Sequence, residues 1–178
     1  MSEPAPRLGL APDVARMVRV DHAGEYGAVR IYAGQLAVLG RGRHGPMLAH
    51  MREQEEQHLA FFAEQIANRR VRPSALLPFW HVAGFALGAL TAALGSRAAM
   101  ACTVAVEEAI DGHYAGQAEA LGDGEPELHG LIEHCRAEEL QHRDIGLAHE
   151  AELAPGYRYL YRFIKTGCQV AIALSERL

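Results

Sequence analysis

Six residues of types that bind metal ions occur in two sets of the same order, a lone glutamate followed by a Glu-x-x-His motif. The first set is Glu25, Glu55 and His58, and the second is Glu107, Glu139 and His142. The lone glutamate precedes its motif by 30 residues in the first set and by 32 in the second. Because residues i and i+3 lie on one face of an α-helix, each motif can direct a carboxylate and an imidazole at the same ion. The near-equal spacing predicts two copies of one helical hairpin.

The four glutamates lie among apolar residues that recur with the 3.6-residue period of a helix. Leu48, Met51 and Phe62, for example, share a helical face with Glu55 and His58. The pattern therefore predicts four carboxylates that point into the protein. An isolated ionised carboxylate in a protein interior costs several kcal/mol, so four of them would unfold a helical bundle unless they were protonated or neutralised.

Two divalent cations would neutralise such a cluster, because four carboxylates balance their charge and neutral imidazoles add none. A glutamate from each of two helices and a Glu-x-x-His motif from each of two others is the donor set of di-iron carboxylate bundles. Structural zinc prefers cysteine and histidine, whereas four carboxylates with two imidazoles suit iron or manganese. We therefore predict a di-metal centre. The alternative is a set of surface glutamates and histidines that bind no metal.

Six segments bounded by prolines and glycines are predicted to be helices. They are residues 13–39, with Asp13 as the N-cap, and residues 46–70, 76–95, 97–121, 126–151 and 156–177. No segment alternates with a period of two between hairpin turns, so no sheet is expected. The predicted fold class is all-α: a four-helix bundle that carries the six residues, with two additional helices.

The composition is that of one compact domain over residues 1–178, with residues 1–12 expected to be flexible. The chain has 178 residues, of which 49% are hydrophobic, and a formal net charge of −5. An acidic chain without a basic stripe is a poor nucleic-acid binder. Its three cysteines stand 33 residues apart, which provides neither a disulfide framework nor a thiolate zinc site and favours a reducing compartment. The first residues lack the pattern of a secretory signal.

The segment 73–96 contains no Lys, Arg, Asp or Glu over 24 residues. That length can span a bilayer, but Pro78, His81 and several glycines and alanines weaken this interpretation. The other two interpretations are a buried core helix and a helix that lies in the membrane interface, and we expect the interfacial helix. Phe79 and Trp80 would then be interface anchors or gate residues, assisted by aromatic and basic residues of the final helix.

Residues 40–45 satisfy the pattern G-x-G-x-x-G of dinucleotide-binding proteins. That motif works where it follows a strand and opens the helix of a βαβ unit. Here it follows a predicted helix, and no strand surrounds it. We therefore interpret residues 40–45 as a basic loop between two helices.

The chain resembles the flavin-independent demethoxyubiquinol hydroxylases of ubiquinone biosynthesis, a ferritin-like di-iron family. The similarity extends from about residue 16 to the C-terminus. The segments that carry it are Arg19–Ala28, Ile31–Gln35, Glu55–Leu59, Cys102–Glu108, His113–Tyr114, Glu138–His142, Asp144–Leu147, Glu152–Pro155 and Ala171–Leu178.

The resemblance implies a ferritin-like fold and assigns two iron ions to the six residues found above. Glu55 and Glu139 would bridge the irons, and Glu25 and Glu107 would be terminal ligands. The implied reaction is hydroxylation of a demethoxy-polyprenylbenzoquinol by O2, with NADH as the reductant. His113 and Tyr114 would take part in proton and electron transfer; the alternative is a core tyrosine beside a surface histidine.

The resemblance also implies a peripheral protein on the cytoplasmic face of a bacterial inner membrane, where an accessory lipid-binding protein serves some family members. Three other classes of function stay open at this point. They are a non-catalytic iron-binding or storage bundle, a di-metal enzyme that handles peroxide, and a metal-free helical protein that docks on membranes.

Acidic residues near the predicted ligands fall into two groups. Asp21, Asp111 and Asp144 are candidates to accept the second N–H of a metal-bound histidine, but the favoured interpretation of each is an ordinary helix-surface or capping residue. Glu56, Glu108 and Glu138 adjoin ligands in the sequence but lie about 100° away on the helix, because each residue turns an α-helix by that angle. We expect these three on the outer face.

Overall fold

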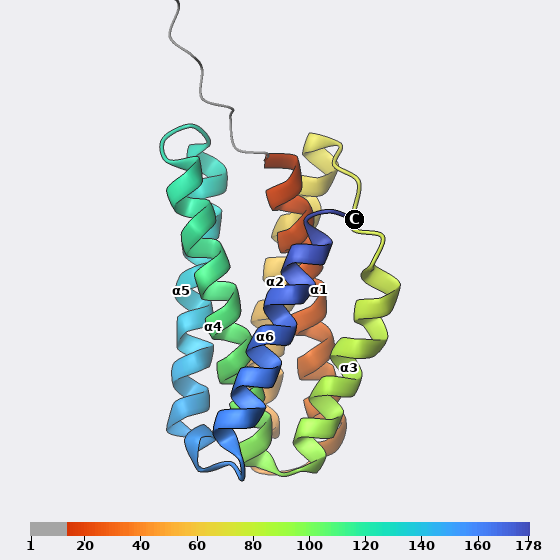
Figure 1. Ribbon diagram of the computed structural model, residues 1–178, viewed down its shortest axis with the longest axis vertical. Coiled ribbons are helices and arrows are strands. Elements are labelled where there is room, and N and C mark those ends of the chain that lie inside the picture. Colours follow the sequence, from red (N-terminus) through yellow and green to blue (C-terminus); the bar gives the residue numbers. More distant parts are fainter. Residues whose placement is uncertain (1–13) are drawn as a thin grey trace, which may run out of the picture.

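The computed structural model describes residues 14–178, which form six α-helices and one short 3₁₀ helix (Figure 1). The elements are α1 (Val14–Leu39), α2 (Gly45–Arg69), α3 (Leu77–Ala93), α4 (Ser96–Leu121), α5 (Pro126–Ala148), η1 (Ala151–Leu153) and α6 (Tyr157–Ser175). All six predicted helices are present, and the described residues contain no strand. The expected N-cap Asp13 and the expected flexible segment 1–12 lie outside the described residues.

The predicted helix 126–151 is three residues too long at its C-terminal end. Glu150 has a positive φ of 64°, a backbone conformation that interrupts a right-handed helix. Its carboxylate accepts hydrogen bonds from Nε and Nη2 of Arg97, at 2.9 and 2.7 Å. The turn between α5 and η1 is therefore tied to the beginning of α4, and this contact with a distant segment is invisible in the local sequence pattern.

The four helices that carry the six predicted residues, α1, α2, α4 and α5, run along the long axis of the molecule (Figure 1). α1 packs against α2, and α4 packs against α5. The two additional helices lie outside this set: α3 packs on α1, and α6 packs mainly on α4. The arrangement is that expected for a ferritin-like bundle with two extra helices.

Glycines allow α1 and α3 to approach each other at backbone distance. A Cβ atom added at Gly88 of α3 would lie 1.9 Å from the carbonyl oxygen of Ile31, and one added at Gly34 of α1 would lie 2.2 Å from that of Phe85. Both distances are far shorter than a van der Waals contact. The glycines of α3 thus serve its packing on α1.

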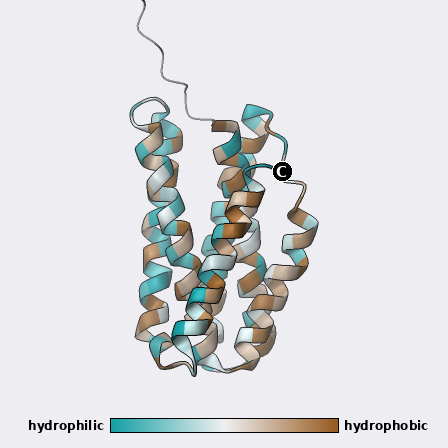
Figure 2. Cartoon of the chain, in the orientation of Figure 1, coloured by the Kyte–Doolittle hydropathy of each residue, from teal (hydrophilic) through white to brown (hydrophobic). Residues whose placement is uncertain are grey.

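The outer face of α3 is apolar and exposed. Phe79, Val82, Leu90 and Leu94 are 59–72% exposed, and much of the helix is apolar by residue type (Figure 2). The alternative of a wholly buried core helix is therefore wrong. Among residues 14–178, no helix has both the length and the apolar character needed to cross a bilayer.

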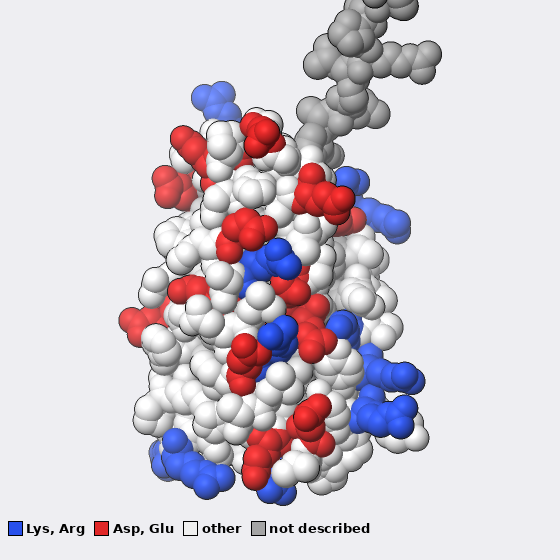
Figure 3. All heavy atoms as spheres, turned by 90° about the vertical axis from the view of Figure 1, so that its left-hand side faces the viewer, with Lys and Arg blue, Asp and Glu red and all other residues white. Residues whose placement is uncertain are grey.

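Two further expectations concern the surface. Residues 40–44 connect α1 to α2 as a turn, without the strand that a dinucleotide-binding motif requires. The side of the molecule shown in Figure 3 carries acidic and basic side chains interspersed over its centre, with further basic side chains along its right-hand edge.

Candidate metal centre

The six predicted residues meet in one buried cluster inside the bundle. Each of them is at most 1% exposed. Their ligand atoms form two groups, in each of which all atoms lie within 4.8 Å of one another. The first group is Glu25, Glu55, His58 and Glu139, and the second is Glu55, Glu107, Glu139 and His142. Glu55 and Glu139 belong to both groups, as expected for residues that would bridge two ions.

Both histidines direct Nδ1 toward this cluster. His58 Nδ1 lies 3.1 Å from Glu139 Oε1, and His142 Nδ1 lies 3.0 Å from Glu55 Oε1. Within each Glu-x-x-His motif, the histidine Nδ1 and its own glutamate are 3.9 Å apart in α2 and 3.5 Å apart in α5. The i,i+3 spacing thus places both side chains of each motif at the same point of the bundle, as the sequence predicts.

Several buried atoms of the cluster have no hydrogen-bond partner. They are Glu25 Oε2, both carboxylate oxygens of Glu55, Glu107 Oε2, Glu139 Oε2 and His142 Nδ1. An unsatisfied buried polar atom costs about 1–3 kcal/mol, and more where it is charged. These atoms are carboxylate oxygens and an imidazole nitrogen, the donor set that suits iron or manganese. The residues present therefore fit a pair of divalent cations.

Without metal, protons neutralise the cluster. Burial raises the pKa of Glu55 and of Glu107 well above its ordinary value of 4.5, and Glu139 raises both further. Burial alone would also raise the pKa of Glu139, but the nearby imidazoles of His142 and His58 lower it to about 2. Burial alone would lower the pKa of His58, but the nearby carboxylates of Glu139 and Glu25 raise it to about 11. Metal ions entering the cluster must therefore displace protons.

Two buried tyrosines hold the lone glutamates. Tyr114 Oη donates to Glu25 Oε1, and Tyr32 Oη donates to Glu107 Oε1 at 2.6 Å. Burial raises the pKa of both phenols, and the nearby carboxylates raise it further, so both remain protonated donors. The spacing of the candidate ligands does not reveal the contact of Tyr32. The signal for it is that a buried phenol needs a hydrogen-bond partner.

His113, the other predicted catalytic residue, lies beside the cluster and not in it. Its Nε2 is 3.3 Å from Asp21 Oδ1 and 2.8 Å from Gln117 Nε2, and Gln117 Nε2 also donates to Asp21 Oδ1 at 2.8 Å. Burial raises the pKa of Asp21 from 3.8 to about 6, although bonds to His113 lower it in part. The structure therefore brings Tyr114 to the cluster and His113 to a buried aspartate next to it.

None of the three candidate aspartates contacts a histidine of the cluster. Asp144 is exposed and Asp111 is half-buried, which agrees with the interpretation as ordinary helix residues, whereas Asp21 is buried. Asp111 pairs with Arg136 at 2.7 Å, and Asp144 pairs with Arg143 at 2.6 Å on the surface. Asp21 binds His113, as described above. All three carboxylates are engaged by side chains other than the two histidines of the cluster.

The structure instead places Glu138 and Gln54 on the outer nitrogens of the two histidines. Glu138 Oε2 lies 2.7 Å from His58 Nε2, and Gln54 Oε1 lies 3.1 Å from His142 Nε2. The prediction that Glu138 points outward is wrong because that flank of α5 faces α2, and its side chain is only 24% exposed. Glu56 lies on the surface, as predicted.

Glu108 does point away from the cluster, but α6 covers it. Its carboxylate accepts hydrogen bonds from Tyr161 Oη and from Lys165 Nζ, the latter at 2.8 Å. These contacts hold α6 against α4. The outer-face prediction for Glu108 is thus right about direction and wrong about exposure to solvent.

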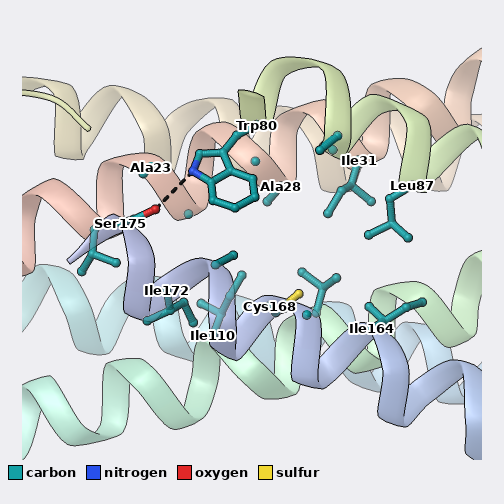
Figure 4. A pocket seen from close by; sticks show the side chains of 18 of the residues that line it. Ala23, Ala28, Ile31, Trp80, Leu87, Ile110, Ile164, Cys168, Ile172 and Ser175 are labelled. Carbon is teal, nitrogen blue, oxygen red and sulfur yellow. Dashed lines mark hydrogen bonds between the residues drawn. The ribbon is translucent and has the colours of Figure 1, made fainter. Parts of the chain in front are cut away.

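An apolar cavity of about 190 Å³ lies between α3 and α6, with α1 and α4 behind it (Figure 4). Gly24 and Val106 line it, and the residues that follow them in the chain, Glu25 and Glu107, belong to the cluster. Trp80 Nε1 donates to Ser175 Oγ at 3.1 Å and thereby joins α3 to α6 across one part of the cavity. The cavity and the cluster thus share two helices.

Comparison with known proteins agrees with this site. A family model described as "Ubiquinone biosynthesis protein COQ7" matches residues 12–175. The "3-demethoxyubiquinol 3-hydroxylase" of Rhodospirillum rubrum is 58% identical over 93% of this chain and 78% of its own. The mitochondrial "NADPH-dependent 3-demethoxyubiquinone 3-hydroxylase" of Bos taurus is 59% identical over the same shares, and the "5-demethoxyubiquinone hydroxylase" of Saccharomyces cerevisiae is 43% identical over 92% and 77%. The chain therefore belongs to the COQ7 family of ubiquinone biosynthesis proteins.

Proposed function

We propose that this protein is a 3-demethoxyubiquinol 3-hydroxylase, a monooxygenase that acts late in ubiquinone biosynthesis through a di-iron centre. The observation that carries the proposal is the buried cluster of four glutamates and two histidines, whose unpartnered oxygens suit divalent cations. The names of relatives 58% and 59% identical to this chain supply the substrate and the reaction. The whole chain would act as one domain.

Each cluster residue has a proposed role as a ligand. Glu25 and His58 would hold one iron, Glu107 and His142 would hold the other, and Glu55 and Glu139 would bridge them. Two bound irons would supply the activation of O2, for which protein side chains alone are unsuited. Tyr32 and Tyr114 would keep the terminal carboxylates aimed at the irons through the hydrogen bonds described above.

The apolar cavity is the proposed site of the prenylated substrate. Its lining is formed by small and aliphatic side chains with few polar atoms, which suits a hydrocarbon tail and excludes water. Its position next to Glu25 and Glu107 would bring the quinol ring toward the irons. Tyr114 and His113 would then serve proton and electron transfer, with Asp21 holding the imidazole of His113.

Electrons would come from a reduced nicotinamide. NADH is the reductant expected from the family resemblance, whereas NADPH appears in the names of several relatives. A direct comparison of NADH and NADPH in the turnover assay below decides between them.

We further propose that the protein is peripheral to the cytoplasmic face of a bacterial inner membrane. α3 carries exposed apolar residues, and α6 carries a second exposed set, which includes Tyr159 and Phe163 at 84% and 77% exposed. Both helices line the cavity, so an interfacial position would open it toward the bilayer that holds a prenylated quinol. An accessory lipid-binding protein could deliver the substrate at the same face.

The test is turnover of a demethoxyubiquinol by protein loaded anaerobically with Fe²⁺ and then exposed to O2 and a reduced nicotinamide. Glu55→Gln should abolish hydroxylation and iron binding, because Glu55 belongs to both ligand groups. Glu56→Gln alters the next residue of the same helix, which is exposed, and should change neither.

Each rival function predicts another result in that assay. An iron-storage bundle would take up iron without hydroxylating the quinol, and a peroxide-handling enzyme would turn over hydrogen peroxide and ignore the quinol. A metal-free docking protein would bind no iron. Any of these outcomes in the wild-type protein would refute the proposed activity.

A further inference from the structure

The two histidines of the cluster are held from behind by different chemical groups. A carboxylate, Glu138, lies 2.7 Å from the outer nitrogen of His58, whereas an amide, Gln54, lies 3.1 Å from that of His142. The six cluster residues themselves are symmetric, with one lone glutamate and one Glu-x-x-His motif on each side. The two proposed metal positions therefore differ in the residue that contacts the Nε2 atom of the histidine and not in the ligands themselves.

The partner of the outer nitrogen fixes which nitrogen can bind metal. Both histidines direct Nδ1 at the cluster, so Nδ1 must be free of its proton for coordination and Nε2 must carry one. A group that accepts the Nε2 proton selects this tautomer, holds the ring in place and makes Nδ1 a stronger donor. Hydrogen bonds to a charged acceptor are shorter and roughly twice as strong as those to a neutral one.

Gln54 and Glu138 also contact each other. The amide oxygen of Gln54 accepts from His142, which leaves its NH2 group to donate to the Glu138 carboxylate. One carboxylate therefore binds His58 directly and reaches His142 only through an amide. Both residues lie where α2 faces α5, and Glu138 is partly exposed while the cluster itself is sealed from solvent.

We propose that Glu138 and Gln54 are positioning residues that make the two metal positions inequivalent, with the ion beside His58 bound more tightly than the ion beside His142. This inference rests on the proposed di-metal centre but not on the reaction. The expected effect of losing such a partner is a roughly 10- to 100-fold loss of metal affinity.

The experiment is an anaerobic titration of the metal-free protein with Co²⁺ alone, followed by calorimetry and by the visible absorption of the bound ion. The wild-type protein should show two unequal dissociation constants. Glu138→Gln keeps the shape of the side chain and removes its charge, and it should weaken the tighter step roughly 10- to 100-fold, bringing the two constants together. Glu56→Gln, an exposed neutral replacement on α2, should leave both constants unchanged.

Two additional measurements separate this role from a merely structural one. Mössbauer spectra of protein loaded with ⁵⁷Fe²⁺ should show two distinct doublets, of which Glu138→Gln changes one. Gln54→Leu should change the other doublet and weaken only the looser step. This second variant also tests the inference if Glu138→Gln fails to fold.

Three results would overturn the inference: equal constants in the wild-type protein, equal effects of Glu138→Gln on both steps, or no effect on either. A wild-type protein that binds two Co²⁺ ions in this way leaves the proposed reaction to be judged by turnover alone. A wild-type protein that binds no metal would overturn both the inference and the proposed function.

Discussion

Tyr32 on α1 donates a 2.6 Å hydrogen bond to Glu107 on α4, so the phenol of one helix holds a cluster carboxylate of another. Both residues are at most 2% exposed. The bond crosses the bundle between α1 and α4, which the contacts of Glu25 with Tyr114 and of Asp21 with Gln117 also join. It therefore links the position of a predicted metal ligand to the packing of the core.

Tyr32→Phe should lower the stability of the protein and weaken the binding of the metal ion that Glu107 would hold. The variant leaves a buried carboxylate without its donor, which costs about 1–3 kcal/mol in the free energy of unfolding. Chemical denaturation of the metal-free protein measures this loss. Tyr159→Phe removes a hydroxyl from a side chain that is 84% exposed and should be neutral. Equal stability of the two variants would show that the Tyr32 bond contributes nothing.

Metal binding should tighten as the pH rises. Burial raises the pKa of Glu55 and of Glu107 well above its ordinary value, so in the metal-free protein each carboxyl holds its proton more tightly than an exposed one and must lose it on binding metal. Titration with Mn²⁺ between pH 5.5 and 8 should give dissociation constants that fall with pH, and a weakly buffered solution should acidify on loading. A constant affinity over this range would contradict proton displacement.

Asp21→Asn should change how stability depends on pH. Burial raises the pKa of Asp21 from 3.8 in the ordinary state to about 6 in the folded state. Above pH 3.8 the unfolded chain releases this proton while the folded protein retains it, so wild-type stability falls as the pH rises toward 6. Asparagine removes that penalty.

The quantity to compare is the free energy of unfolding of Asp21→Asn minus that of the wild type. Between pH 4 and pH 7 this difference should increase by on the order of 2–3 kcal/mol, which means that the variant becomes the more stable protein relative to the wild type. Because Glu55 and Glu107 are unchanged, their own pH dependence cancels in the difference. A difference that stays flat from pH 4 to 7 would mean that Asp21 ionises normally in the folded protein.

Gly88→Ala should separate α3 from α1. The added Cβ would lie 1.9 Å from the carbonyl oxygen of Ile31, and backbone cannot yield as a flexible side chain does. Overpacking of this kind costs about 1–3 kcal/mol or more, visible in thermal unfolding. Gly112→Ala in α4 meets no atom within 4 Å and should stabilise its helix by up to about 1 kcal/mol. The two substitutions should therefore have opposite signs.

Binding to lipid should depend on α3 and α6. The double variant Leu90→Ser with Phe163→Ser removes apolar side chains that are 66% and 77% exposed on these helices. Partition onto vesicles of phosphatidylethanolamine and phosphatidylglycerol, measured by flotation, should fall roughly 30- to 1,000-fold, because each of the two side chains contributes about 1–2 kcal/mol when it is buried.

The matched control makes the same two changes elsewhere. Leu147→Ser with Phe61→Ser alters exposed residues of α5 and α2, away from the cavity. This protein should bind vesicles like the wild type. If both double variants lose binding alike, the contact is not specific to α3 and α6.

The helices and the six cluster residues were predictable from sequence because both depend on local spacing. A Glu-x-x-His motif on an apolar stripe defines its own face of a helix, and proline and glycine limit each segment. The end of α5 was not predictable, since it depends on a bond from Arg97 to Glu150, which lies 53 residues away.

Contacts between helices were also beyond the sequence pattern. A helical wheel places Glu138 100° from Glu139 and so on the outside, but the rotation of α5 turns that flank toward α2 and His58. Asp21 likewise faces His113 of α4 and not a cluster histidine. Partners of this kind depend on how the packed helices are rotated relative to each other, and the sequence of one helix does not determine that rotation.

α1 contributes to two sites of opposite polarity, since Gly24 lines the apolar cavity and its neighbour Glu25 belongs to the metal-binding cluster. A molecule that enters the cavity and rotates α1 must displace Glu25 as well. By thermodynamic reciprocity, ions that fix Glu25 must then alter the affinity of the cavity for its guest by the same factor. Under that condition, binding in the apolar cavity and binding in the metal centre would be coupled through α1.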